Sequence, residues 1–304
     1  MKTKKQAEAA VHICDRDGRP LTDANAGQGK FLRLLYGNPV GRFALKGLTC
    51  PVVSQWVGDA MEHPLSTIAI PYTVKTKQIP MGQYQKEVYR SYNAFFTRAI
   101  LPQYRPIDSC SSVLISPCDA KLTVIPIEEQ TRFTIKGAAY RLSALVGCKR
   151  LAQQYIGGYC LVFRLTPDDY HRYCFPDDCK VGKTRNIDGV LHTVNPVSAD
   201  YVKVYHQNSR AVTMLHTAHF GDLLQIEVGA LLVGKIVNHP YQPLTEVKRG
   251  SEKGYFAFGG STIVVITPPN TVRIDADLLR NSRDGAETRI RMGERIGWAD
   301  TSYH

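Results

Sequence analysis

The 304-residue sequence lacks several features that would place it in a well-defined class. It has no run of roughly 18 apolar residues, so no transmembrane helix is predicted and we expect a soluble or surface-bound protein. Its eight cysteines form no C-x-x-C pair, so neither a zinc site nor a redox motif is indicated. No secretory hydrophobic region follows the opening MKTKKQAEAA, and we therefore expect reduced thiols in a cytosolic setting.

Positive charge, by contrast, is in excess. Lys and Arg number 38 against 27 Asp and Glu, which gives a formal net charge of +11. Such an excess favours an anionic partner, such as a nucleic acid or an acidic lipid surface, although a solvated basic surface is the alternative. The 43% of hydrophobic residues are enough for a sizeable core.

The distribution of apolar residues predicts two parts, residues 1–110 and 111–304. In the first part, the stretch from Phe31 to Met61 mixes large apolar residues with cations, and its prolines limit helices to short pieces. Such helices are typical of an interfacial membrane contact, and also of helices packed on a β core. The second part has short runs rich in Val, Ile, Thr and aromatics, which predict strands. We therefore predict an α+β fold, with a mainly antiparallel, sandwich- or barrel-like β core and N-terminal helices.

The stretch GYFAFGGSTIVV contains an interrupted strand. Gly259 and Gly260 break the apolar pattern, and Ser261 follows them directly. Glycine inside a strand often marks a close approach of backbone to another group. The strand-forming TIVVIT after Ser261 does not fit the strand-to-helix turn of a hydrolase nucleophile. We therefore expect the hydroxyl of Ser261 to face its own chain, where the Gly260 carbonyl is open to attack because glycine has no Cβ.

Two other stretches carry residues that suit a proton relay. SPCDAKL contains Asp119, and PDDYHRYCFP contains His171. A carboxylate that orients an imidazole, and an imidazole that takes a hydroxyl proton, are the parts of such a relay. Spacing alone does not single these residues out. We interpret Asp168 and Asp169 as capping a turn rather than acting as acids.

At this point the sequence resembles the phosphatidylserine decarboxylase family. GYFAFGGSTIVV resembles the family's glycine-serine-threonine signature, at which the proenzyme cuts itself. SPCDAKL, PDDYHRYCFP and LHTVNP resemble three further motifs, and SYNAFFTRAILPQYRPID resembles the family's aromatic helix, expected here to end near Pro102. VGALLVGKIVNH and GAETRIRMGERIG resemble its penultimate strand region and C-terminal segment. The motifs follow the family's order from about residue 30 to 300.

The resemblance implies a self-cleaving enzyme. Asp119 and His171 would activate Ser261, whose oxygen attacks the Gly260 carbonyl. Cleavage between Gly260 and Ser261 would yield a large and a small chain in one fold, with Ser261 converted to a covalent pyruvoyl group. That group would form a Schiff base with phosphatidylserine and act as the electron sink during decarboxylation to phosphatidylethanolamine. His171 is the predicted proton donor, and neither a metal nor an added cofactor is implied.

The sequence departs from the family pattern at one position. Many members have a second histidine three residues after the first, where this chain has Cys174. Either His171 serves both cleavage and decarboxylation, or His192 or His239 substitutes for the missing histidine. We interpret Cys174 as a buried structural residue, because free cysteine is usually inert.

Partners and competing functions follow from the same residues. Arg172 could bind a phosphate or form a structural ion pair, and His192 and His239 are further candidates for substrate binding. The resemblance implies phosphatidylserine in an anionic membrane as the partner, a peripheral position at the cytoplasmic face, a homodimer and no nucleic acid. Alternatives are a pyruvoyl-dependent decarboxylase of a free amino acid, a serine hydrolase that does not cut itself, and a non-catalytic β-rich membrane-binding module.

Overall fold

The fold is seen in a computed structural model, which describes residues 12–22, 51–128, 132–135, 138–189, 208–229, 235–258 and 261–300. The helices in these ranges are α3 (Pro51–Glu62), α4 (Ala69–Thr76), α5 (Tyr92–Phe96), α6 (Leu142–Val146), α7 (Lys149–Gln153) and α10 (Ala276–Arg283). Short 3-10 turns are η1 (Pro64–Ile68), η2 (Met81–Gln83) and η3 (Pro102–Tyr104). His192 and Gly260 lie outside the described residues, as does most of the stretch from Phe31 to Met61.

Strands make up most of the rest of the described chain. In chain order they are β1 (Ile13–Cys14), β2 (Pro20–Leu21), β3 (Val113–Ile115), β4 (Ala120–Pro126), β5 (Arg132–Ile135), β6 (Ala138–Arg141), β7 (Tyr159–Leu165), β8 (Arg172–Cys174), β9 (Cys179–Ile187), β10 (Arg210–Thr217), β11 (Asp222–Val228), β12 (Ile236–Asn238), β13 (Thr245–Val247), β14 (Glu252–Phe256), β15 (Ser261–Ile266), β16 (Val272–Ile274), β17 (Glu287–Ile290) and β18 (Arg295–Ala299). The runs of Val, Ile and Thr that predicted strands are found here as β3, β4, β7, β10, β11 and β15.

A ten-stranded sheet forms the centre of the molecule, in the order β13-β9-β10-β11-β15-β7-β4-β17-β1-β2. Its neighbours pair antiparallel, apart from the parallel pair of β1 and β17. Two three-stranded sheets accompany it, β12-β14-β8 and β16-β18-β3. The predicted α+β fold with a mainly antiparallel core is therefore confirmed.

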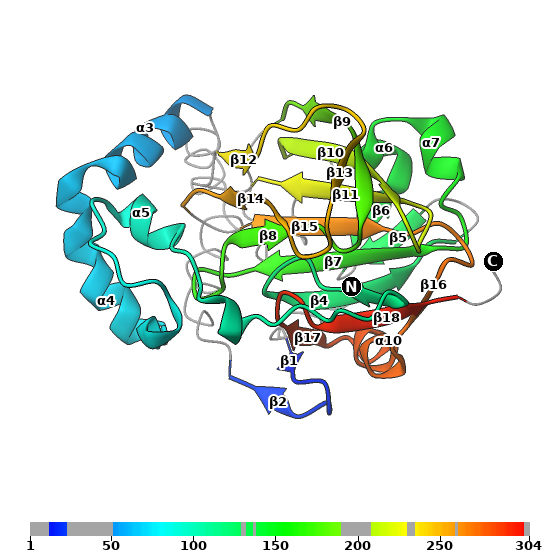
Figure 1. Cartoon of the computed structure of the whole chain (residues 1–304), viewed down its shortest axis with the longest axis horizontal. Coiled ribbons are helices and arrows are strands. Elements are labelled where there is room, and N and C mark those ends of the chain that lie inside the picture. Colours follow the sequence, from blue (N-terminus) through cyan, green and yellow to red (C-terminus); the bar gives the residue numbers. More distant parts are fainter. Residues whose placement is uncertain are drawn as a thin grey trace, which may run out of the picture.

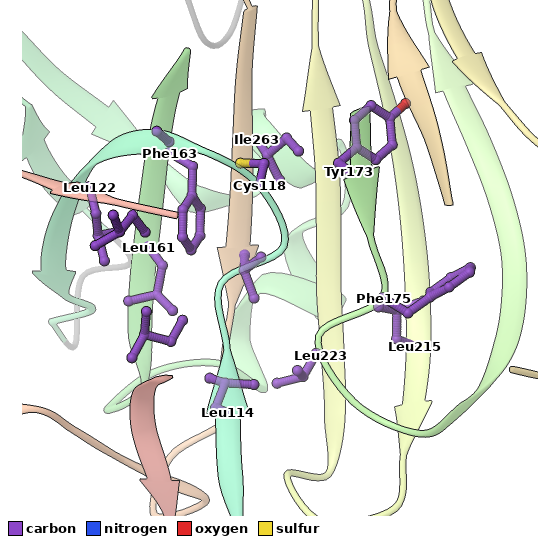
Figure 2. Packing of buried hydrophobic residues seen from close by; sticks show 14 of the residues in the cluster. Leu114, Cys118, Leu122, Leu161, Phe163, Tyr173, Phe175, Leu215, Leu223 and Ile263 are labelled. Carbon is purple, nitrogen blue, oxygen red and sulfur yellow. The ribbon is translucent and has the colours of Figure 1, made fainter. Parts of the chain in front are cut away.

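Alternation along the strands gives the main sheet two buried faces. On β15, Ile263 and Val265 belong to one apolar cluster, whereas Val264 and Ile266 belong to the other. The first cluster includes residues of the two smaller sheets and of α10, such as Tyr173, Phe256 and Leu278. Figure 2 shows part of it, with side chains from several strands meeting between the layers. The second cluster is completed by α6 and α7. The sheet is thus covered on both faces, which makes β15 inaccessible to solvent along its length.

The N-terminal helices α3, α4 and α5 lie together beside the sheet, at the left of Figure 1. In the part of the chain that the structure describes, no helix is both long and apolar enough to cross a bilayer. Helix α5 is shorter than predicted: it ends at Phe96 rather than near Pro102. Beyond it, Ile100 forms a β-bridge with Tyr84, and its N–H donates to the hydroxyl of Tyr170, so tertiary pairing ends the helix early.

Candidate active site

Ser261 begins β15, in the middle of the main sheet. It pairs with Leu165 of β7, and the next residue, Thr262, pairs with Val228 of β11. The side chain of Ser261 is completely buried. Strands on both sides therefore hold the serine hydroxyl in one place, immediately after the predicted cut.

The ring of His171, just before β8, reaches Ser261. Its Nδ1 lies 3.4 Å from Oγ of Ser261, and its Nε2 lies 3.1 Å from the carbonyl oxygen of Thr166. Because a carbonyl oxygen can only accept, Nε2 carries the ring proton and Nδ1 is left with a lone pair. The fold thus brings the predicted serine and histidine together and aims the basic nitrogen at the hydroxyl.

The surroundings of His171 keep the ring neutral. Burial, assisted by the positive charge of Arg98, lowers the pKa of the imidazole to about 3. At neutral pH, Nδ1 is therefore unprotonated and able to accept the hydroxyl proton.

Arg98 supplies that charge from a wall of aromatic rings. It is 1% exposed, and its guanidinium lies 4.3 Å from the ring centroid of Tyr84 and 4.9 Å from that of Phe95. It donates to the Tyr84 hydroxyl and the Phe95 carbonyl at 3.2 and 3.3 Å. Among the described residues no carboxylate pairs with it, and its Nε has no partner. Its charge is therefore poorly neutralised, and it opposes protonation of His171.

A buried ion pair holds the Thr166 carbonyl in position. Asp169 accepts from the backbone N–H and hydroxyl of Thr166 at 2.7 and 2.9 Å, and Lys121 donates to both carboxylate oxygens of Asp169 at 2.8 and 2.7 Å. Burial raises the pKa of Asp169 despite this partner. The interpretation of Asp169 as a turn-closing residue is confirmed, and the turn that it closes also fixes the tautomer of His171.

Asp119 is buried nearby, but its contacts differ from those of a relay carboxylate. It pairs with Arg105, whose Nε donates to Oδ1 at 2.7 Å, and it accepts from the backbone N–H of Met292 at 2.9 Å. In the described part of the chain, the polar partners of the His171 ring are Ser261 and Thr166 instead. A role for Asp119 in cleavage stays a prediction.

Arg172 and His239 share one carboxylate. Arg172 donates to Glu252 at 3.1 and 3.2 Å and to the carbonyl of Thr97 at 2.8 Å, and His239 contacts Glu252 at 2.8 Å. The structural ion pair foreseen for Arg172 is therefore present. Binding of substrate by either residue stays a prediction, as it does for His192 outside the described residues.

Cys174 is buried, and burial raises the pKa of its thiol to about 12. Because the thiolate is the reactive form, this thiol is inert at neutral pH, and its interpretation as a structural residue is confirmed. The seven cysteines that the structure describes are all free. Within the described ranges, no group of three or more His, Cys, Asp or Glu residues is arranged to hold a metal ion.

Helix α5 supplies a wall that the motifs alone did not assign to the site. The ring of Phe96 stacks on His171 with centroids 4.0 Å apart. Phe258, the last described residue before the predicted cut, packs edge-on against Phe96 and Tyr92 at 5.6 and 5.2 Å. The aromatic spacing in SYNAFF indicates a buried helix face, but nothing in it shows that the face contacts His171.

Comparisons with known proteins identify the family of the chain. The phosphatidylserine decarboxylase family model matches residues 92–298. The chain is 40% identical to phosphatidylserine decarboxylase proenzyme 2 of Clostridium acetobutylicum, over 95% of this chain and 98% of the relative. It is 38% identical to the phosphatidylserine decarboxylase proenzyme of Chlamydia felis, over 88% and 91% of the two chains. A serine at a strand start, a neutral histidine at its hydroxyl and these similarities lead to one conclusion: the chain belongs to the phosphatidylserine decarboxylase family of carboxy-lyases.

Proposed function

We propose that the chain is a precursor that cuts itself between Gly260 and Ser261 and then decarboxylates phosphatidylserine to phosphatidylethanolamine. The observation that carries this proposal is the contact of the buried Ser261 hydroxyl with the unprotonated Nδ1 of His171 at 3.4 Å. A buried serine with a base at its hydroxyl cannot serve external substrates until the chain changes. It suits attack on the adjacent peptide bond.

The proposed cleavage passes through an ester between Gly260 and Ser261. His171 takes the hydroxyl proton, Oγ of Ser261 bonds to the Gly260 carbonyl carbon, and the peptide C–N bond breaks as the proton passes to the freed nitrogen. Loss of the Ser261 Cα proton to His171 then breaks the ester C–O bond and releases the Gly260 carboxylate. Residue 261, now a dehydroalanine, rearranges to an imine, and water replaces its nitrogen, which leaves as ammonia. Residue 261 becomes a pyruvoyl group.

The residues present fit that group. Ser261 carries the hydroxyl that must be eliminated, and after the cut it becomes the first residue of a strand held between β7 and β11. The pyruvoyl carbonyl supplies an electrophile for the substrate amine and a sink for the electrons left by departing carbon dioxide. Nδ1 of His171 faces residue 261, and it is the proposed group that takes a proton from the substrate ammonium and later returns it to the substrate carbon. The two chains stay in one fold because β15 keeps its neighbours.

The proposed substrate is a lipid in an anionic membrane, reached from the cytoplasmic face by a peripheral protein. Two observations support this: the net charge of +11, and four large apolar side chains that are at least 70% exposed on α3, η1 and α4, namely Trp56, Leu65, Ile68 and Tyr72. The division at residues 1–110 and 111–304, with the first part associating with the membrane, and the homodimer remain proposals.

Denaturing mass spectrometry tests the cleavage directly. We expect two fragments from an active preparation, the smaller one beginning with a blocked residue 261, and an intact, inactive chain of 33.9 kDa from Ser261→Ala. An intact wild-type chain with decarboxylase activity would overturn the proposal. An intact chain that hydrolyses esters would instead indicate a serine hydrolase. Cleaved protein that acts on free serine but not on the lipid would indicate an amino-acid decarboxylase.

A further inference from the structure

The backbone just before the predicted cut is held by three different acceptors. Phe256 ends β14, and its N–H donates to the carbonyl of His171 at 3.0 Å. The N–H of Ala257 donates to the carbonyl of Lys235 at 3.1 Å. For Phe258 the acceptor is a side chain: Oδ1 of Asn93, at 2.9 Å. Backbone pairing therefore gives way to a side-chain contact at the last described residue before Gly259.

The contact of Phe258 with Asn93 lies three residues before Ser261, close to the predicted cut. Ser261 is fixed by its pairing in the main sheet, and Phe258 is fixed by Asn93, so Gly259 and Gly260 alone separate two anchored residues. Glycine restricts its own backbone less than any other residue. Attack on a carbonyl needs the reacting atoms held about 3–3.5 Å apart. The anchors on either side must therefore supply that restriction.

Asn93 is itself oriented by Glu62 at the end of α3. Its Nδ2 donates to Oε1 of Glu62, and the Ser91 hydroxyl donates to Oε2 of the same carboxylate at 3.2 Å. Because a carboxylate only accepts, Glu62 turns the Asn93 amide so that its oxygen faces the N–H of Phe258. The side chains of Glu62 and Asn93 thus connect α3 to the segment that precedes the cut.

We propose that Asn93, oriented by Glu62, is a positioning residue for self-cleavage: it holds Phe258 so that the Gly260 carbonyl is presented to Ser261. This inference rests on the proposed cleavage between Gly260 and Ser261. Asn93 touches neither reacting atom in the described contacts and acts through the backbone of Phe258.

The test follows the full-length chain during cell-free synthesis, with a pulse of labelled amino acid and a chase, and measures the rate at which the precursor disappears. Asn93→Ala removes the acceptor and is expected to slow cleavage at least tenfold. Asn93→Asp keeps an acceptor but sets a second carboxylate against Glu62, and it is also expected to slow cleavage. Glu62→Gln replaces a group that only accepts with an amide that can also donate, so it no longer dictates the orientation of the Asn93 amide, and it should slow cleavage less than Asn93→Ala does.

The double variant Glu62→Gln with Asn93→Asp separates positioning from general destabilisation. There the new amide donates to the new carboxylate, which again accepts from Phe258, so cleavage should recover most of the wild-type rate. Asn281→Ala is a control for the loss of an asparagine side chain with long-range hydrogen bonds: the Asn281 amide donates to the carbonyl of Asp15 at 3.3 Å and to the hydroxyl of Thr288 at 3.1 Å. It should lower the melting temperature without slowing cleavage.

Wild-type cleavage in the same assay distinguishes this inference from its premise. If wild type stays intact, the proposed cleavage is wrong and the inference is overturned with it. If wild type cleaves and Asn93→Ala cleaves equally fast, or the double variant is no faster than Asn93→Asp, only the inference is overturned.

Discussion

Two neighbouring helical regions differ in how far their apolar residues are buried. Neither η1 nor α4 has a buried residue, and Tyr72 on α4 is 73% exposed. The short helix α5 buries Tyr92, Phe95 and Phe96, and Phe96 is 1% exposed against His171. Apolar side chains are therefore exposed in one region, where we propose a lipid surface, and form a wall beside His171 in the other.

Polar contacts join the two regions. The backbone N–H of Tyr92 donates to the hydroxyl of Ser66 at 2.8 Å, and the hydroxyls of Thr73 and Tyr92 are 3.1 Å apart. Together with the contact of Glu62 and Asn93, these bonds fix the exposed helices relative to α5. The comparison predicts that the proposed membrane contact and the proposed cleavage depend on adjacent but separable sets of side chains.

The largest expected difference between the two regions is in the unfolding free energy lost when one aromatic residue of each is changed to alanine. Phe96→Ala leaves a cavity beside His171, which should cost about 3–5 kcal/mol of unfolding free energy and slow cleavage strongly. Tyr72→Ala should change the unfolding free energy by no more than about 0.5 kcal/mol, because its ring is exposed. Denaturant melts and the precursor-cleavage assay measure both effects. Equal losses of unfolding free energy at Phe96 and Tyr72 would contradict the distinction between the two regions.

Substituting the four exposed apolar side chains of α3, η1 and α4 should weaken lipid binding and leave cleavage unchanged. The variant has Trp56, Leu65, Ile68 and Tyr72 all changed to serine. It loses apolar surface that would contribute about 1.5–3 kcal/mol per side chain if a lipid layer buried that side chain fully. We expect at least tenfold weaker flotation with anionic liposomes and an unchanged rate of self-cleavage. The control is the same protein with neutral liposomes. Undiminished flotation with anionic liposomes would show that the lipid surface is elsewhere.

Near neutral pH, the smallest expected effect is a pH dependence of stability from His171. The folded state holds its pKa near 3, below the ordinary value of about 6.5, so the unfolded chain binds the proton more readily. This contribution to stability is fully present above about pH 6.5 and is lost as the pH falls toward 3, with a slope of at most about 1.4 kcal/mol per pH unit.

His171→Gln isolates that contribution. The unfolding free energies of wild type and variant are measured at pH 7, 6 and 5. As the pH falls, the unfolding free energy of wild type should decrease relative to that of the variant. A pH-independent difference would mean that His171 is not held neutral. Other titrating groups, including Asp169, cancel in the difference unless the substitution disturbs them.

Much of the fold could be inferred from the sequence, whereas the contact of Ser261 with His171 was implied only by the family resemblance. Strand-forming runs predicted the β core, because alternation and β-branched residues report burial locally. The double glycine draws attention to Ser261, and the resemblance implies His171 as its base. The partner of Asp119 could not be inferred, because Arg105 is 14 residues away on a separate segment and nothing local distinguishes it from other arginines.

The sequence by itself determined which chemical groups are available: a serine after two glycines, a histidine between tyrosine and arginine, and an aromatic helix. Only the tertiary structure decided how they act. The carbonyl of Thr166 selects the tautomer of His171, Arg98 and burial keep its ring neutral, and Asn93 reaches Phe258 across 165 residues of sequence. Hydrogen-bond direction and burial depend on neighbours in space, and these are set by sheet pairing and helix packing between distant segments.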